Sequence, residues 1–185
     1  MLDVRRGPDM LAVTMEHVEG VSLARSLERS GALKPWQALR LAYQVGETLR
    51  YLHEQGVVHR DVAPGNLMIT PKGNVRLIDF GLAAPLGVAR ADVGTPGYRA
   101  PEQETPGAVL SEKSDIYGFG VTLHRLLTAE LPQERTPRED LASGLRALLS
   151  RCLDLDPQAR PSARELRQAL HELEAIFASG ERANG

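Results

Sequence analysis

Three side chains suited to phosphoryl-transfer chemistry lie close together in this sequence. Asp61 and Asn66 are five positions apart, and Asp79 follows thirteen positions after Asn66. One carboxylate can orient a hydroxyl nucleophile and accept its proton, while a second carboxylate and an amide oxygen can bind a hard divalent cation. Positioning and charge neutralisation supply most of the catalysis in such reactions. The spacing therefore favours phosphoryl transfer.

A short β-hairpin is predicted beside these residues. Two apolar runs, at 67–70 and 75–78, flank the sequence Pro71-Lys72-Gly73-Asn74, whose residue types are typical of turns. Asn66 immediately precedes the first run and Asp79 immediately follows the second. The hairpin is therefore expected to border the candidate site.

Helices are predicted for most of the remaining chain. The clearest is 35–54, which Pro35 opens and Gly56 ends, and whose apolar residues recur at three- and four-residue steps. Ser22 is the predicted cap of a second helix, and Ser162 forms a capping box with Glu165 at the start of the last one. The other predicted elements are a strand that runs into a connector within 10–18, and helices at 22–29, 114–128, 140–153 and 162–178.

Two segments are predicted to lack regular structure. Residues 81–113 are rich in Gly, Pro and Ala and show no period, and a loop of that length inside a compact domain is usually functional. The residues from Gly180 to Gly185 are expected to fray.

Composition narrows the class of protein. The 185 residues are 42% hydrophobic and 25% charged, which are ordinary globular values, and the formal net charge of −2 argues against nucleic acid or an anionic membrane as an obligatory partner. Cys152 is the single cysteine, so no intrachain disulfide is possible. There is no long apolar run and no signal-peptide pattern. A cytoplasmic location is expected.

The motifs, taken in order, resemble those of eukaryotic-type protein kinases. His59-Arg60-Asp61 with Asn66 comes first, then Asp79-Phe80-Gly81, then Gly94-Thr95-Pro96-Gly97-Tyr98-Arg99-Ala100-Pro101-Glu102. Ser114-Asp115-Ile116-Tyr117-Gly118-Phe119-Gly120 and Asp156-Pro157-Gln158-Ala159-Arg160-Pro161 follow. The resemblance spans about 10–178. It implies a mainly α fold: a kinase C-terminal lobe with a hinge strand and a small hairpin at the active site.

The resemblance also implies a domain division and a substrate class. Residues 1–9 would be a remnant of the N-terminal lobe or a disordered start, 10–178 the kinase-like domain, and 179–185 a frayed tail. Thr95, in Gly-Thr-Pro-Gly-Tyr, accompanies serine/threonine specificity in this family. ATP and a protein with a Ser or Thr acceptor are therefore the expected partners, with no nucleic acid and no membrane segment.

Catalytic roles follow from the resemblance residue by residue. Asp61 would be the catalytic acceptor of the substrate hydroxyl proton, and Asn66 and Asp79 would hold Mg²⁺ against the phosphates of ATP. Met15 corresponds to the gatekeeper beside the adenine pocket. The residues that correspond to nucleotide contacts are Glu16 and Val18 through their backbone, Ser22 at the ribose, and Met68 under the adenine ring.

Further residues correspond to scaffold positions of the family. His59 is expected to pack against Phe80 rather than act as a base, and Gly81 completes that motif. Glu102 and Arg160 would form an ion pair that holds the 81–101 loop to the helical body. Asp115 would accept hydrogen bonds from backbone N–H groups of the catalytic loop, residues 59–66.

The sequence departs from the family pattern at three places. Ala63 stands where most serine/threonine kinases have a lysine that neutralises the transferred phosphate. Residues 82–94 contain no Ser, Thr or Tyr, so a phosphate switch through Arg60 has no usual site, and Asp92 could supply the anion instead. The Gly-rich loop and strand lysine of the N-terminal lobe are missing, since nine residues precede the hinge strand.

These departures leave three hypotheses open. The chain is a truncated protein serine/threonine kinase of doubtful activity, or a kinase-like module that binds a partner through its exposed cleft face. A small-molecule phosphotransferase of the aminoglycoside or choline kinase type shares the Asp61–Asn66 pattern, including Pro64-Gly65-Asn66. The Gly94–Glu102 segment and Arg160 favour a protein kinase over this third hypothesis.

Overall fold

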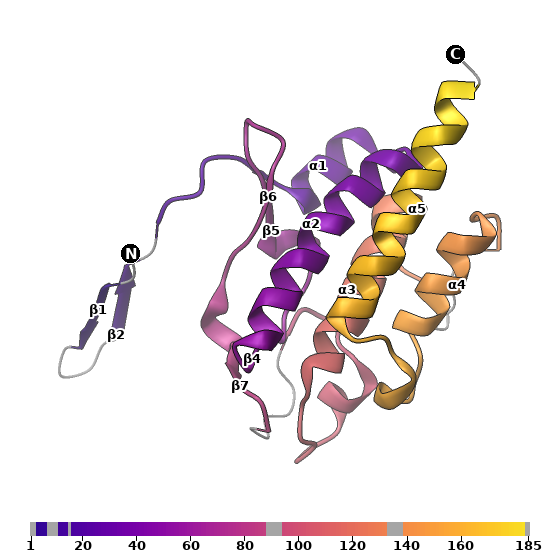
Figure 1. Ribbon diagram of the computed structural model, residues 1–185. Helices are drawn as coiled ribbons and strands as arrows, with labels where there is room; N and C mark the ends of the chain where they lie inside the picture. Colours follow the sequence, from indigo (N-terminus) through magenta and orange to yellow (C-terminus); the bar gives the residue numbers. More distant parts are fainter. Residues whose placement is uncertain (1–2, 7–10, 15, 88–93, 133–138, 184–185) are drawn as a thin grey trace.

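The computed structural model describes residues 3–6, 11–14, 16–87, 94–132 and 139–183. In this part of the chain, helices predominate and the strands are short (Figure 1). The predicted mainly α class is therefore confirmed.

Five α-helices form the body of the described structure. They are α1 (Leu23–Ser30), α2 (Pro35–Glu54), α3 (Glu112–Thr128), α4 (Ser143–Cys152) and α5 (Ala163–Ala183). Each overlaps a predicted helix. The last helix, α5, ends at Ala183, five residues beyond the predicted end at 178. The fraying expected for the last residues stays a prediction.

The predicted caps are present. The Ser22 hydroxyl accepts a hydrogen bond from Arg25 N at 3.3 Å at the start of α1. At the start of α5, the Ser162 hydroxyl accepts from Glu165 N at 3.2 Å, and the Glu165 carboxylate accepts from Ser162 N at 2.7 Å. These bonds satisfy N–H groups that have no partner within a helix.

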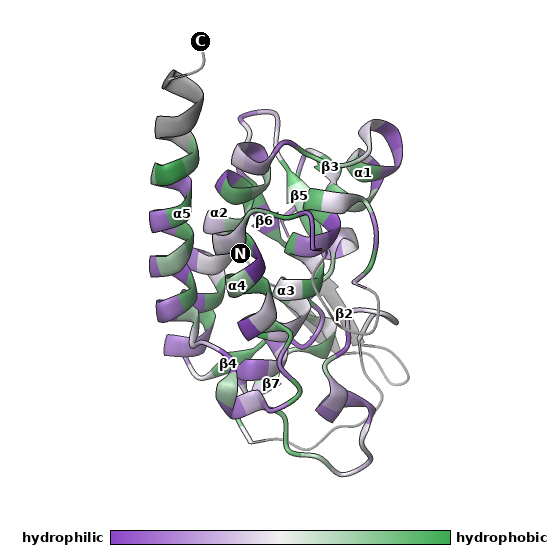
Figure 2. Cartoon of the chain, turned by 90° about the vertical axis from the view of Figure 1, so that its right-hand side faces the viewer, coloured by the Kyte–Doolittle hydropathy of each residue, from purple (hydrophilic) through white to green (hydrophobic). Residues whose placement is uncertain are grey.

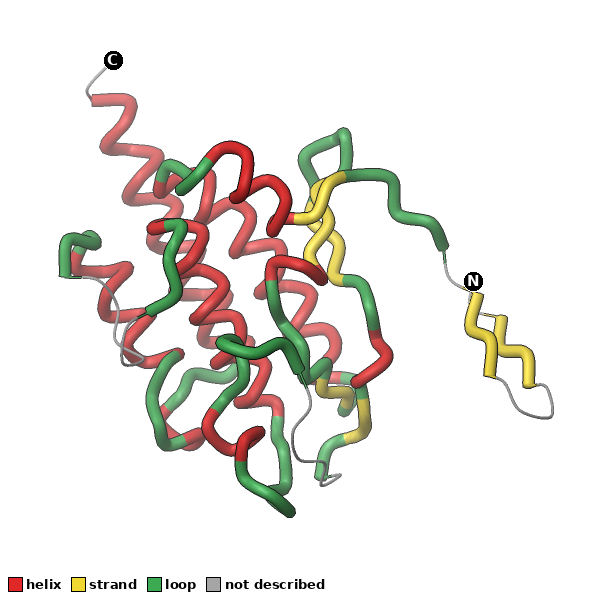
Figure 3. Tube along the Cα trace, turned by 180° about the vertical axis from the view of Figure 1, so that it is seen from behind, coloured by secondary structure: helices red, strands yellow, loops and turns green. Residues whose placement is uncertain are grey.

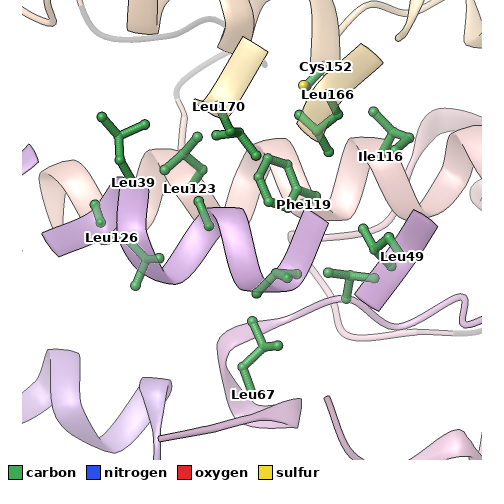
Figure 4. Close-up of a cluster of buried hydrophobic side chains, with 14 of the residues drawn as sticks. Leu39, Leu49, Leu67, Ile116, Phe119, Leu123, Leu126, Cys152, Leu166 and Leu170 are labelled. Atoms are coloured by element: carbon green, nitrogen blue, oxygen red, sulfur yellow. The ribbon is translucent and has the colours of Figure 1, made fainter. Parts of the chain in front are cut away.

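The hydrophobic core lies where α2, α3 and α5 pack together. Phe119 and Leu123 of α3 lie between α2 and α5, with Leu39 on one side and Leu170 on the other (Figure 4). Figure 2 shows hydrophobic and hydrophilic residues alternating around α5, as expected of a helix with one buried face. This core supports the loops that carry the candidate site.

A three-stranded antiparallel sheet lies at one edge of the helical body. It contains β3 (Val21–Ser22), β5 (Leu67–Ile69) and β6 (Val75–Leu77), in the order β3-β5-β6. The predicted hairpin is confirmed as β5 and β6. The remaining strand, β3, was not predicted, because its two residues are too few for an alternating pattern to be visible in the sequence.

A second hairpin precedes the helical body. It pairs β1 (Asp3–Arg6) with β2 (Leu11–Thr14), and an extended connection leads from it into β3 (Figure 3). Residues 3–6 pair in register along their whole length with β2, and the division of the chain at residue 9 stays a prediction. Within 10–18 the predicted strand is present as β2, and residues 16–19, which have no regular structure, fit the predicted connector.

Short elements also interrupt the predicted 81–113 loop. β7 (Ala84–Pro85) pairs with β4 (Val57–Val58). The 3₁₀ helices η2 (Phe80–Leu82) and η3 (Pro101–Glu104) precede and follow residues 88–93, which lie outside the described part of the chain. Asp92 therefore lies outside the described residues, and its proposed role as an anion near Arg60 stays a prediction.

The predicted ion pair between Glu102 and Arg160 anchors this loop to the helical body. The guanidinium binds both carboxylate oxygens, at 2.7 and 2.9 Å, and the Ser114 hydroxyl donates to the same carboxylate at 3.0 Å. Arg160 is buried and also donates to the carbonyl oxygens of Lys113 and Asp154 at 2.9 and 2.8 Å. One side chain thus joins η3, the start of α3 and the chain before α5.

Replacing Arg160 should destabilise the fold strongly. Arg160→Met removes the charged partner of the Glu102 carboxylate and the hydrogen bonds to the Lys113 and Asp154 carbonyl groups. We therefore expect a loss of about 3–5 kcal/mol in the free energy of unfolding, measured by urea denaturation. Arg164→Met is the matched control, because Arg164 is an exposed residue of α5, and its change should stay within about 0.5 kcal/mol. Equal losses in the two variants would contradict this role.

The same ion pair should make stability depend on pH. Burial alone would raise the pKa of Glu102, but the hydrogen bond and charge of Arg160 outweigh it and hold the pKa below its ordinary value of 4.5. The stability contributed by ionised Glu102 is therefore fully present above pH 4.5 and is lost as the pH falls through the lower folded-state pKa. The difference in unfolding free energy between the wild type and Glu102→Gln should shrink below pH 4.5; a difference independent of pH would contradict it.

Candidate functional site

The Asp61 carboxylate is held by two neighbours from different parts of the chain. Asn66 Nδ2 donates to Asp61 Oδ2 at 2.7 Å and to the Asp61 carbonyl oxygen at 3.0 Å. The backbone N–H of Thr95 donates to Asp61 Oδ1 at 2.7 Å. These bonds fix the orientation of the carboxylate. They also turn the amide nitrogen of Asn66 toward Asp61, which leaves its Oδ1 without a hydrogen bond among the described residues.

The β5–β6 hairpin brings Asp79 beside Asn66. Leu67 pairs with Leu77 across the two strands, and Ile78 N donates to the Asn66 carbonyl oxygen at 2.8 Å. Asp79 is the next residue, so it follows the strand end that lies against Asn66. Two residues 13 positions apart in sequence thereby become neighbours.

Asp79 has a left-handed backbone, with φ 63° and ψ 74°. Its Oδ1 accepts a hydrogen bond from Gly81 N at 3.1 Å, and an ideal Cβ at Gly81 would lie 3.0 Å from that oxygen. The side chain is exposed, and its Oδ2 has no hydrogen bond to the described residues. Asp79 Oδ2 and Asn66 Oδ1 are thus both uncommitted oxygen atoms.

This donor set fits Mg²⁺. The described residues contain no group of three or more His, Cys, Asp or Glu side chains that could enclose a metal ion. Mg²⁺ commonly takes one or two protein oxygens and completes its octahedron with water and substrate phosphates. One amide and one carboxylate oxygen therefore suit a cation that arrives with a nucleotide.

His59 serves as a structural residue. It is fully buried, its Nε2 lies 3.2 Å from the Ile78 carbonyl oxygen, and its Nδ1 accepts a hydrogen bond from Asp61 N at 3.3 Å. Both contacts are satisfied by the neutral tautomer with the proton on Nε2. The predicted contact with Phe80 is present as an edge-to-face ring pair with centroids 4.9 Å apart, although the Phe80 side chain is 41% exposed.

Asp115 holds the backbone of the catalytic loop, as predicted. Its Oδ1 accepts from Arg60 N at 2.7 Å and its Oδ2 accepts from His59 N at 2.9 Å. His53 adds a third contact, with Nε2 at 2.9 Å from Asp115 Oδ2. The sequence did not reveal His53, because it belongs to α2 and lies 62 positions away from Asp115.

Ala63 is buried in a small apolar cluster. Its neighbours there include Tyr98, Ala100 and Tyr117, and it is 2% exposed. The methyl group thus contributes to packing between the catalytic loop and α3. Residues 62–65, between Asp61 and Asn66, include no lysine or arginine. The loop itself therefore places no cationic side chain beside the Asp61 carboxylate.

The residues expected to contact the nucleotide occupy two adjoining places. Ser22 and Met68 pair across β3 and β5. Glu16 and Val18 line an open cleft of about 590 Å³ together with residues of the β5–β6 hairpin, including Arg76. Met15 lies outside the described residues. The nucleotide-binding roles of Glu16, Val18, Ser22 and Met68 stay predictions.

None of the described helices is long and apolar enough to cross a membrane.

Comparison with known proteins agrees with this geometry. A family model described as protein kinase domain matches residues 1–171. The serine/threonine-protein kinase pkn2 of Myxococcus xanthus is 34% identical over 97% of this chain and 26% of its own length. Pkn3 of the same organism is 32% identical over 95% of this chain, and PrkC of Bacillus subtilis (strain 168) is 34% identical over 70%.

The chain spans only part of these relatives. The matched regions are 38% of the length of pkn3 and 21% of the length of PrkC. The motif order, the positions of Asp61, Asn66 and Asp79, the Glu102–Arg160 pair and the family match all agree. The chain belongs to the protein kinase family and is a member of its serine/threonine kinase branch.

Proposed function

We propose that this domain transfers the γ-phosphate of ATP to serine or threonine hydroxyl groups of proteins. The observation that carries the proposal is the Asp61 carboxylate, which Asn66 and Thr95 hold in place beside the strand end that leads to Asp79. Catalysis of phosphoryl transfer depends mainly on positioning. It requires a carboxylate oriented in this way beside oxygen ligands for a cation, here Asn66 Oδ1 and Asp79 Oδ2.

Asp61 would act on the acceptor hydroxyl. Its carboxylate accepts the hydrogen bond of the hydroxyl and takes the proton as the oxygen attacks the γ-phosphorus; the bond from that phosphorus to the leaving oxygen of ADP breaks. Asn66 Oδ1 and Asp79 Oδ2 would bind Mg²⁺, which neutralises phosphate charge when it is bound. Glu16, Val18, Ser22 and Met68 would contact the nucleotide.

A protein acceptor is favoured over a small molecule. The segment 94–104 passes directly over Asp61 and is anchored to the helical body through Glu102 and Arg160. A segment that is anchored at this place offers a surface beside Asp61 against which a polypeptide can lie. The relatives are also named as serine/threonine-protein kinases. Because Ala63 replaces the expected loop lysine, turnover by this chain should be slow.

Substitution of Asp61 and Asp79 tests the proposal. Asp61→Asn should lower kcat for phosphate transfer to a Ser/Thr-containing acceptor protein by about 10²-fold or more, because the amide cannot take the proton. Asp79→Ala should abolish the increase in melting temperature that Mg²⁺ and ATP give the wild type, because a bound ligand stabilises only a chain that binds it.

Asp156→Asn is the matched control for these assays. Asp156 is exposed and accepts a hydrogen bond from Gln158 N at 2.8 Å, a capping role that Asn also fills. Wild type and control should transfer phosphate equally. Equal transfer by Asp61→Asn would refute the proposal, and absence of both transfer and a nucleotide-dependent thermal shift in the wild type would favour a kinase-like module that binds a partner.

A further inference from the structure

We propose that Gln103 is a positioning residue that makes the orientation of Asp61 depend on the folded state of the segment 94–104. Its effect on phosphate transfer rests on the function proposed above. Its effect on the backbone of the catalytic loop does not, because that effect is a matter of hydrogen bonding alone. The two can therefore be measured separately.

The side-chain amide of Gln103 joins two parts of the chain. Gln103 lies in η3 and is 2% exposed. Its Oε1 accepts a hydrogen bond from Ala100 N at 2.9 Å, within its own turn, and its Nε2 donates to the Arg60 carbonyl oxygen at 2.9 Å. Only one orientation of the amide satisfies both contacts, because one partner is a donor and the other an acceptor. The turn therefore aims the N–H group at Arg60.

The Arg60 carbonyl belongs to the peptide group that enters Asp61. A peptide group is planar, so its C=O and N–H ends move together. Gln103 holds the oxygen end, and His59 Nδ1 accepts from the Asp61 N–H end at 3.3 Å. The peptide plane that precedes the Asp61 Cα is thus held at both ends, by the side chains of Gln103 and His59.

The backbone at this point needs such support. Arg60 has φ 71°, in the left-handed region that non-glycine residues rarely adopt. Conformations of this kind persist only when the surroundings over-determine them. Asp115 binds the N–H of Arg60 and Gln103 binds its C=O. Removing the Gln103 donor takes away this hydrogen bond to a buried carbonyl group and weakens the hold on a residue in a strained conformation.

Gly94 shows how closely the segment is fitted to the same carbonyl. An ideal Cβ at Gly94 would lie 2.9 Å from the Arg60 oxygen and 3.3 Å from Gln103 Nε2. The next residue, Thr95, donates its N–H to the Asp61 carboxylate. The segment 94–104 therefore contacts the catalytic loop at two points, the carboxylate of Asp61 and the peptide group before it.

Two substitutions separate the two hydrogen bonds of Gln103. Gln103→Glu keeps an oxygen for Ala100 N and, as a carboxylate, places a second oxygen against the Arg60 carbonyl, so the contact to the catalytic loop is lost while the contact to Ala100 is kept. Gln103→Met has similar volume and loses both contacts. Gln168→Met is the control, since Gln168 is exposed on α5 and donates only to Glu172.

The primary measurement is amide hydrogen exchange in the full chain, resolved by residue. In Gln103→Glu the N–H groups of Asp61 and Thr95 should exchange about tenfold faster or more than in the wild type, as expected when a buried hydrogen bond is lost. The N–H groups that pair β5 with β6 should keep their protection. In phosphate-transfer assays kcat should fall by a similar factor with KM for ATP unchanged, and Gln168→Met should match the wild type.

Two results of the exchange experiment would contradict the proposal. In the first, the Asp61 and Thr95 N–H groups exchange at the wild-type rate in Gln103→Glu and faster only in Gln103→Met. Gln103 would then act only as a cap of its own turn. Loss of protection in β5 and β6 as well would make it a general packing residue. If the wild type transfers no phosphate while the exchange pattern appears as expected, the proposed function fails and the coupling stands.

Discussion

The buried carboxylate of Asp115 is the interaction on which the candidate site depends. It lies in the first turn of α3 and binds the backbone N–H groups of His59 and Arg60, with His53 of α2 against the same oxygen as His59. A carboxylate is well placed there, because the N-terminus of a helix carries partial positive charge. Three elements are joined by one side chain, and the loop that carries Asp61 starts from that junction.

The same turn of α3 also anchors the segment on the other side of the site. Ser114 donates to Glu102, and the carbonyl of Lys113 accepts from Arg160. The catalytic loop and the segment 94–104 are therefore both held by hydrogen bonds to the start of α3. The core beneath it, around Phe119, keeps that helix in place. Relative positions of groups that touch the substrate are thus set by a rigid element rather than by the loops themselves.

Sequence reasoning succeeded where the determinants are local. The hairpin, the caps at Ser22 and Ser162 and the helix patterns depend on residues a few positions apart, and all are present. The Glu102–Arg160 pair was predicted from motif order, not from spacing. It connects residues 58 positions apart, which no local pattern could have revealed.

The residues that sequence reasoning missed all act over long separations. His53 reaches Asp115 across 62 positions and Gln103 reaches Arg60 across 43. Both are common residue types within helical or turn sequences, and nothing adjacent marks them. The burial of Ala63 against Tyr98 was likewise invisible, because it depends on how the segment returns over the loop. The end of α5 at Ala183 was missed for a different reason, because the helix continues past Phe177, where the clear apolar period of the sequence stops.

The two hydrogen bonds on the Asp61 carboxylate have a geometric consequence for the acceptor. An ionised carboxylate offers about four lone-pair directions, and Thr95 and Asn66 occupy one on each oxygen. If Asp61 accepts the hydrogen bond of an acceptor hydroxyl, as proposed above, that hydroxyl would approach along one of the remaining directions, on the side of the carboxylate that neither neighbour covers. Hydroxyls on short, flexible stems can meet this requirement where a rigid ring-borne hydroxyl would need the whole ring to fit. The free lone-pair directions of the Asp61 carboxylate would then by themselves restrict which acceptor hydroxyl groups can be used, in addition to any contact with surrounding residues.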